Sequence, residues 1–140
     1  MPRITAKTNV FLNREKKYRM TLEFKEAIEL IPCEKGSFVM ADFEDEAFML
    51  FGDEAASDPC AAIEVAVIQD AFDKYDKEIF VQVLARMTET VMKYTQIPED
   101  RIFAYYRNSP LWTYKRQDII GTLVHVCPPV KSIVNNIINK

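Results

Sequence analysis

The sequence predicts an α/β (α+β) fold in which a strand–helix–strand unit occurs twice and builds one four-stranded sheet with both helices on one face. Each half of the 140-residue chain contains an apolar run of strand length, a segment with helical spacing and a second apolar run. Both helical segments run into the same dipeptide, Ile31-Pro32 in the first half and Ile97-Pro98 in the second. This repetition indicates an internal duplication.

The first half of the chain contains the three elements in the expected order. The alternating run from Arg3 to Val10 is typical of a short strand, and the apolar run from Ser37 to Phe43 has the length of a second strand. Between them, apolar residues recur at helical spacing: Met20, Phe24, Ala27, Ile28 and Ile31. Pro32 cannot continue a helix, so we expect it to close this one.

The second half repeats the same order. Strands are predicted from Ala61 to Ile68 and from Arg101 to Arg107. The helical positions between them are Ile79, Phe80, Val83, Leu84, Met87 and Val91. Where the halves join, Glu46 to Phe51 has the length of a short extra strand, and Gly52 to Pro59 is expected to be an acidic loop.

One face of the predicted sheet has no cover. Two right-handed crossovers place both helices on the same face. In the strand from Ala61 to Ile68, one set of alternating side chains is entirely apolar, and the other set has Glu64 as its single polar member. Both faces therefore favour burial. Because no further helix is predicted in the core, other copies of the chain are the simplest cover, and we expect a homo-oligomer.

Composition argues against several classes of protein. Eighteen Lys and Arg against 21 Asp and Glu give a formal charge of −3, so the basic excess expected for nucleic-acid or membrane-surface binding is missing. No apolar stretch approaches the ~20 residues of a membrane span. The first ten residues lack the apolar core of a secretory signal. We expect a cytoplasmic protein, and export without a signal peptide stays open.

Metal, nucleotide and disulfide chemistry also find no support in the sequence. His125 is the single histidine, which is too few for the usual zinc site. Three glycines leave no phosphate-binding loop of the known glycine-rich types. Cys33, Cys60 and Cys127 are an odd number at wide spacings, and we expect them to be buried thiols. The sequence therefore predicts neither a metal nor a cofactor.

Four short motifs occur in a fixed order around the duplicated unit: Met1-Pro2, Thr8-Asn9-Val10, Pro59-Cys60-Ala61 and the run from Ile97 to Phe103. With these motifs the chain resembles the macrophage migration inhibitory factor family of the tautomerase superfamily. The resemblance covers residues 1–112 as one domain and leaves 113–140 as a C-terminal extension. It implies a homotrimer whose three sheets form a central barrel, with sites at the subunit interfaces.

The resemblance implies that Pro2 is catalytic once the initiator methionine is removed. A free terminal amine titrates near ~7.7–8.0, and burial in an apolar pocket lowers its pKa. Such an amine is neutral at cellular pH and can take a proton from carbon beside a carbonyl and return it elsewhere. The alternative interpretation is a proline tolerated at a strand edge. If Met1 stays, the nitrogen of Pro2 is an amide and cannot be the base.

The resemblance also points to pocket residues, with departures from the family pattern. The family lysine that binds a substrate carboxylate aligns directly with Glu34 and matches Lys35 only after a one-residue shift; the alternative is a solvated turn lysine. Ile68 matches an apolar pocket residue, or is simply a core residue. Phe103 stands where the best-known members have tyrosine. We infer that Tyr105, two residues on and on the same face, offers a phenol from the neighbouring subunit.

The sequence therefore predicts a cofactor-free keto–enol tautomerase that acts on a small aromatic 2-oxo acid such as phenylpyruvate. The alternative is a non-catalytic binding or signalling module that keeps the trimeric fold. That alternative is allowed by the segment from Ile68 to Phe72, which is bulkier and more acidic than the family's Ile-Gly-Gly loop.

The C-terminal extension carries a pattern of its own. Pro128-Pro129 precedes an apolar stripe at helical spacing, formed by Val130, Ile133, Val134, Ile137 and Ile138. We expect a short helix that docks on the protein's own trimer. The alternative is a helix that binds a protein partner.

Overall fold

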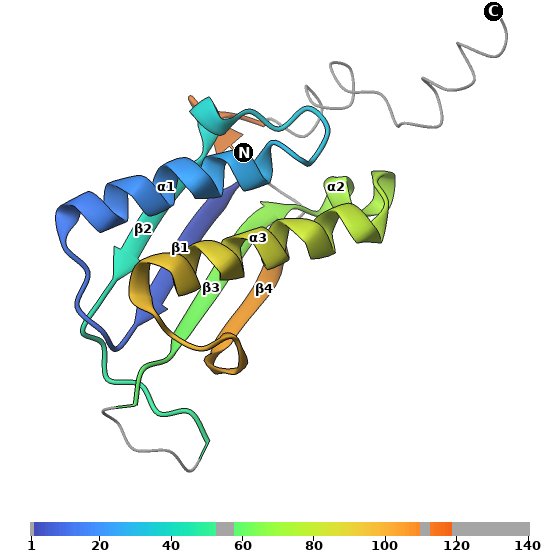
Figure 1. The fold of residues 1–140 in the computed structure, drawn as a ribbon. Helices are drawn as coiled ribbons and strands as arrows, with labels where there is room; N and C mark the ends of the chain where they lie inside the picture. The colour runs from blue at the N-terminus through green and yellow to red at the C-terminus, as the bar shows by residue number, and fades with distance from the viewer. Residues whose placement is uncertain (1, 53–57, 110–112, 119–140) are drawn as a thin grey trace, which may run out of the picture.

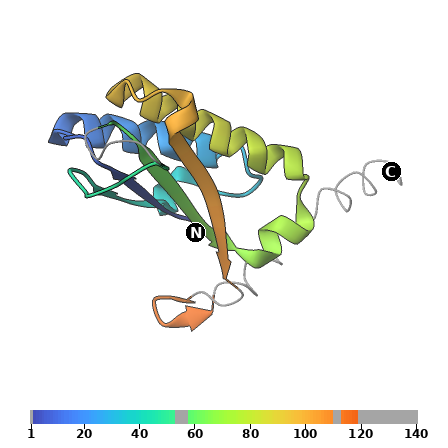
Figure 2. The ribbon, with the colours of Figure 1, turned by 90° about the horizontal axis from the view of Figure 1, so that it is seen from below.

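The computed structural model describes residues 2–52, 58–109 and 113–118, and shows one four-stranded sheet beneath two long helices (Figure 1). The strands lie in the order β2-β1-β3-β4. Both helices cover the same face of the sheet (Figure 2). The bounds of these elements are β1 Arg3–Thr8, α1 Arg14–Ile28, β2 Met40–Glu44, β3 Ala61–Ile68, α3 Lys77–Thr95 and β4 Ile102–Ser109. The predicted fold class is confirmed.

The sheet displays the duplication directly. β1 pairs parallel with β2, β3 pairs parallel with β4, and each pair is joined through a long helix. The two units meet at the antiparallel pair β1–β3, where Ile4 lies opposite Val65. The predicted strand from Ala61 to Ile68 is confirmed to the residue.

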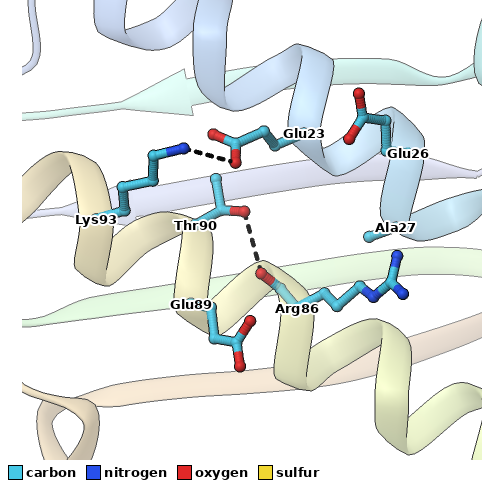
Figure 3. Close-up of a pocket in the computed structure, with 7 residues that line it drawn as sticks. All are labelled: Glu23, Glu26, Ala27, Arg86, Glu89, Thr90 and Lys93. Carbon is cyan, nitrogen blue, oxygen red and sulfur yellow. Dashed lines mark hydrogen bonds and ion pairs between the residues drawn. The ribbon is translucent and has the colours of Figure 1, made fainter.

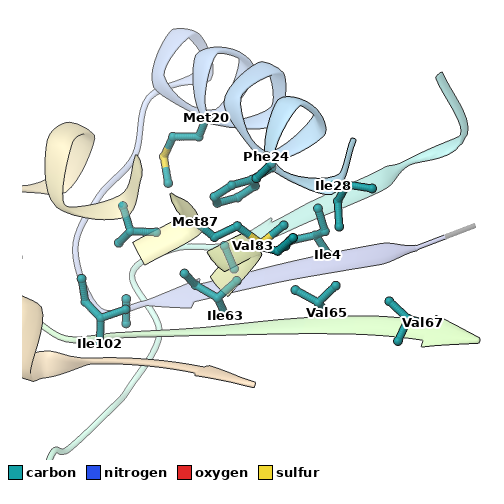
Figure 4. Close-up of a cluster of buried hydrophobic side chains, with 14 of the residues drawn as sticks. Ile4, Met20, Phe24, Ile28, Ile63, Val65, Val67, Val83, Met87 and Ile102 are labelled. Carbon is teal, nitrogen blue, oxygen red and sulfur yellow. The ribbon is translucent and has the colours of Figure 1, made fainter. Parts of the chain in front are cut away.

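The hydrophobic core lies between the sheet and the two helices (Figure 4). Phe24 of α1 is completely buried, and its ring stacks on that of Phe43 with the centroids 6.1 Å apart. The buried positions of α3 are Phe80, Val83, Met87, Thr90 and Val91. Apolar residues on one stripe of each helix therefore account for the packing that the spacing predicted.

The ends of the helices follow from local chemistry. Asn13 begins α1 because its side-chain oxygen accepts a hydrogen bond from the N–H of Lys16 at 2.8 Å. The helix ends at Ile28, three residues before the predicted Ile31, which is buried outside it. The Ile31 N–H bonds back to the Ile28 carbonyl in a tighter turn, because a residue before proline avoids the helical conformation.

The second predicted strand begins three residues later than expected. Residues Gly36–Phe38 form a 3₁₀ turn, and β2 starts only at Met40. The turn lies close to the end of α1: the Gly36 N–H donates to the Glu29 carboxylate at 3.2 Å, and a Cβ at Gly36 would lie 3.1 Å from the Cβ of Lys25. A larger residue at this position would have to displace the Glu29 side chain.

The prediction of a strand from Glu46 to Phe51 is wrong. Glu46 has a φ of 53°, and a left-handed residue interrupts an extended run. The segment is held by bonds from the Glu46 and Ala47 N–H groups to the carbonyls of Val10 and Thr8. Of the predicted acidic loop, residues 53–57 lie outside the described part of the chain.

One element is absent from the sequence-based prediction. The helix α2, Gln69–Lys74, follows β3 without a connecting residue, where the family comparison indicates a loop. Its main inward contact is Phe72, whose ring lies 4.5 Å from that of Phe80 and 5.0 Å from that of Tyr106. Six residues give too short a periodic signal for a helix to be predicted without knowledge of this packing.

The cysteines follow the expectation only in part. Cys60 is a buried free thiol. Cys33 is exposed and disulfide-bonded, so the expectation of a buried thiol is wrong at this position.

Beyond β4 the structure describes a short hairpin of two two-residue strands, β5 (Thr113–Tyr114) and β6 (Gln117–Asp118). The predicted C-terminal helix lies outside the described residues. No helix in the described ranges has the length and apolar character needed to cross a membrane.

We expect stability to depend on Asp45 in acid. Its carboxylate accepts bonds from the Lys17 ammonium at 2.8 Å and the Leu12 N–H at 2.9 Å, and both hold the pKa of Asp45 below its usual range. A carboxyl with a lowered pKa stabilises the fold above about pH 4 and loses that contribution as pH falls through the folded value. Asp45→Asn should therefore reduce the free energy of unfolding at pH 7 by roughly 1–3 kcal/mol and by much less at pH 3.

Urea unfolding at both pH values measures this difference. Glu44→Gln is the control, because the Glu44 carboxylate is exposed and pairs only with Lys7 in the described contacts. The same loss at pH 3 as at pH 7 would contradict the prediction for Asp45.

Candidate functional site at the Pro2 edge of the sheet

Pro2 lies immediately before the central strand β1, at the end of the sheet where β2 begins and β3 ends. This end of the sheet is called the Pro2 edge. It is buried, and its carbonyl accepts a hydrogen bond from the Met40 N–H at 3.2 Å. In register, the next residue, Arg3, faces Met40 at the start of β2 and Ala66 near the end of β3. The chain therefore brings its first described residue to the place where β2 begins and β3 ends.

Ile68 and Lys35 lie at this same edge. Ile68 is the last residue of β3 and is 2% exposed. Lys35 is exposed and directly precedes the 3₁₀ turn that leads into β2, where its carbonyl accepts the Phe38 N–H at 3.0 Å. Three of the five predicted site residues thus share one end of the sheet.

The structure distinguishes Lys35 from its neighbour Glu34. Burial is the main cause that raises the pKa of Tyr75, and the negative charge of Glu34 adds to it. Lys35 is exposed, whereas Glu34 is half-buried. The choice of Lys35 over Glu34 as the site residue stays a prediction.

Phe103 and Tyr105 are not brought to Pro2 within one chain. Both lie on the sheet face away from the helices, where they are 63% and 46% exposed. Phe103 pairs with Ala62, whereas Ser109 pairs with Ile68. Six residues of strand, about 20 Å, separate these two positions. Phe103 and Tyr105 can therefore meet the Pro2 edge only if they come from another copy of the chain.

The face of the sheet that the helices do not cover, called the open face, is more polar than the sequence of β3 alone suggested. Three ion pairs cross it, Arg3–Asp42 at 3.3 Å, Lys7–Glu44 at 3.0 Å and Arg107–Glu64 at 3.5 Å. The apolar side chains of β3 that alternate with Glu64 are those of Ala62, Ala66 and, at the last position of the strand, Ile68. The argument for an oligomer from an apolar face is therefore weaker than the sequence alone indicates.

Tyr105 belongs to this network of charges. Its hydroxyl donates to the Glu64 carboxylate at 2.9 Å, and this bond raises the pKa of Tyr105 above its ordinary value of 10.0. The phenol therefore stays protonated at neutral pH and remains a hydrogen-bond donor.

Two residues that the sequence analysis did not select position Phe103. The ring of Phe51 stacks on that of Phe103 with centroids 5.1 Å apart, and the Arg101 guanidinium lies over Phe51 at 5.3 Å. Arg101 is itself held by the carbonyls of Asp58 and Pro59. The sequence did contain a signal for Arg101, because this residue lies within the motif from Ile97 to Phe103.

Two of the short motifs have a structural role. The Asn9 amide donates to the Asp58 carbonyl at 2.7 Å and accepts the Cys60 N–H at 2.9 Å. The Thr8 hydroxyl donates to the Cys60 carbonyl at 2.8 Å. These bonds fasten the end of β1 to the start of β3, at the end of the sheet opposite Pro2. These hydrogen bonds give the Thr8-Asn9 and Cys60 motifs a role in holding the fold together, and none of them involves the candidate site.

Away from the Pro2 edge, a hollow of about 210 Å³ lies between α1 and α3 in the helical layer (Figure 3). Its lining is mostly charged and partly paired, with Lys93 contacting Glu23 at 3.1 Å. A hydrogen bond from Tyr94 is the main cause that lowers the pKa of Glu23, and Lys93 adds to it. These contacts hold the two helices together, and the hollow shares no residue with the Pro2 edge.

Within the ranges that the structure describes, no three His, Cys, Asp or Glu side chains gather as a metal ion would require. The described side chains at the Pro2 edge are the ring of Pro2, the ammonium group of Lys35 and the apolar side chain of Ile68.

Comparison by sequence finds no matching protein-family model and no matching curated protein. Comparison of folds finds solved structures of macrophage migration inhibitory factor proteins. The chain is similar to the Leishmania major protein MIF2, with a TM-score of 0.74 and 19% identity over 84% of this chain and 97% of that one. Proteins from Toxoplasma gondii and Prochlorococcus marinus, with TM-scores of 0.71 and 0.70, are each 19% identical. They cover 83% of this chain, and 98% and 97% of their own.

These similarities and the duplicated unit agree on the architecture that the motifs indicated. The chain has the fold of the macrophage migration inhibitory factor proteins.

Proposed function

We propose that this protein is a cofactor-free tautomerase that interconverts the enol and keto forms of a small aromatic 2-oxo acid such as phenylpyruvate. The observation that carries the proposal is the position of Pro2, which is buried at the sheet edge beside Ile68 and the Lys35 turn. A buried secondary amine at a chain end has the properties of a general base at neutral pH.

In this mechanism each residue has a distinct role. With Met1 removed, the Pro2 nitrogen takes a proton from carbon beside the 2-oxo group or returns it there, while the oxygen gains or loses the other proton. The Lys35 ammonium binds the substrate carboxylate, and Ile68 forms an apolar wall. No net oxidation occurs, so no cofactor is consumed.

The complete pocket requires more than one copy of the chain. Phe103 and Tyr105 lie far along β4 from the Pro2 edge, and both are exposed on the open face of the sheet. We propose a homotrimer in which these two side chains line the pocket of the neighbouring subunit. Light scattering coupled to gel filtration would give a trimer mass, and a monomer mass would exclude this arrangement.

The competing candidate is a binding module with the same fold and no catalysis. It is favoured by α2, which begins directly after Ile68 and occupies the place of the family's small loop. It is also favoured by Phe103, which has no hydroxyl to polarise a substrate. Both candidates use the same surface, so only activity and the state of the N-terminus separate them.

We expect protein purified from its native host to begin at Pro2 and to ketonise the enol of phenylpyruvate. Intact mass measures the loss of Met1, and ultraviolet absorbance follows the conversion. A rate equal to the buffer blank with Met1 absent would exclude the enzyme and favour the binding module. Quantitative retention of Met1 would exclude Pro2 as the base.

A further inference from the structure

An apolar hollow of about 380 Å³ lies on the flank of the molecule where α2, α3 and β4 meet. Its volume is within the ~300–1,000 Å³ range of pockets that bury a ligand or a docked segment. Its lining residues are Phe72, Lys77, Phe80, Val81, Leu84 and Tyr106. None of these residues belongs to the candidate site.

The aromatic part of this hollow is preformed. The ring of Phe80 stacks on Phe72 at 4.5 Å, and Tyr106 meets both rings edge-on at 5.0 and 5.6 Å. The Tyr106 hydroxyl already donates to the Phe80 carbonyl at 2.8 Å, and burial raises its pKa. The Tyr106 hydroxyl therefore already has a hydrogen-bond acceptor, and the aromatic lining favours an apolar occupant.

The hollow is open because β4 is the last strand of its sheet in the described part of the chain. On the other side of α3, the helix α1 covers the core, but nothing described covers the side beyond β4. Val81 is consequently 49% exposed although it lies beside buried residues of the same helix. The chain itself continues from β4, and consecutive elements usually lie side by side.

We propose that residues 130–138 form an amphipathic helix that docks in this hollow. Five apolar residues lie at helical spacing there, and a helix of nine residues is ~14 Å long. The twelve residue steps from Asp118 to Val130 span up to ~40 Å, which exceeds the dimensions of the domain. The length of chain after the hairpin is therefore sufficient.

Charge also favours this occupant. Residues 69–78 carry four acidic and two basic side chains beside the hollow, whereas residues 119–140 carry two lysines and no acidic residue. Two other grooves in the described part of the chain are lined largely by charged residues of α1 and α3, which do not suit an apolar stripe.

The experiment is amide hydrogen exchange on the full chain. Peptides covering 130–138 should exchange at least about tenfold more slowly than an unstructured segment. Val81→Asp, which places a charge at a position already half-exposed, should abolish that protection, and so should Ile137→Asp. Leu22→Asp is the matched control, because Leu22 is 42% exposed in a different groove, and it should leave the protection unchanged.

Peptides from β1 and β3 report in the same data whether each variant keeps its fold. Removal of residues 119–140 gives a second readout, because it should increase exchange in the α3 segment that contains Val81. Exchange of 130–138 at the unstructured rate would overturn the proposal, and so would protection that survives Val81→Asp. Protection that disappears on dilution would place the helix on a second copy and would also overturn intramolecular docking.

Discussion

Replacing Pro2 by Gly should slow enol–keto conversion by roughly 10²–10⁴-fold, the factor that a positioned acid–base group supplies. The glycine variant still offers an amine after Met1 removal, but that amine is mobile and less desolvated. The rate of the wild-type enzyme should depend on a group that titrates below the free-amine value, and the variant should lose this dependence. Absorbance assays with phenylpyruvate across pH measure both effects.

Pro98→Gly is the control, because Pro98 is an exposed proline at the far end of the sheet, before the 3₁₀ turn that leads into β4. It should retain the wild-type rate. Pro2→Gly should lose some stability, because the ring of Pro2 is buried, but no ladder hydrogen bond, because proline donates none. Circular dichroism shows whether the variant stays folded. Equal rates in wild type and Pro2→Gly, with Met1 absent from both, would remove Pro2 from the mechanism.

The largest loss of stability is expected for Phe24→Ala. Phe24 is 0% exposed and points from α1 toward the sheet (Figure 4). Its ring stacks on that of Phe43. Removing the ring loses its burial and leaves a cavity that the surrounding core fills only in part. The free energy of unfolding should fall by about 3–5 kcal/mol. Urea titration followed by circular dichroism measures this loss.

Phe11→Ala is the matched control, since Phe11 is 66% exposed. Its loss should be within about 0.5 kcal/mol of zero. A small effect of Phe24→Ala, similar to that of Phe11→Ala, would mean that the core around α1 repacks, contrary to the rigid packing described above.

The sequence was informative wherever one periodic face meets the core. The strand from Ala61 to Ile68 and the buried stripe of α3 could be predicted because alternation and helical spacing directly reflect burial. The predictions were wrong where a contact between segments that are distant in the sequence sets the backbone conformation. Gly36 begins a turn in which its N–H donates to Glu29, the residue directly after α1, and Glu46 leaves the extended conformation beside Val10 and Thr8. No pattern within either segment contains that information.

The residues of the candidate site were selected through the family resemblance, not through periodicity, and their roles stay predictions. Pro2, Lys35 and Ile68 lie at the ends of elements, and the order of the strands brings these ends together. Phe51 was not predicted because its importance depends on a ring stack with Phe103, which is far away in the sequence. The polar character of the open face arises from pairs on different strands, which an inspection of β3 alone does not reveal.

Because β1 is a central strand, the N-terminus has no strand partner during the first part of synthesis. β1 is synthesised first, but its parallel neighbour begins at Met40 and its antiparallel neighbour ends at Ile68. At ~5–20 residues per second, the ribosome needs about 3–14 s to supply both partners. Until they pair, Pro2 has no strand partner, so an aminopeptidase that acts during that interval removes Met1 from an unpaired end of the nascent chain, before Pro2 is buried.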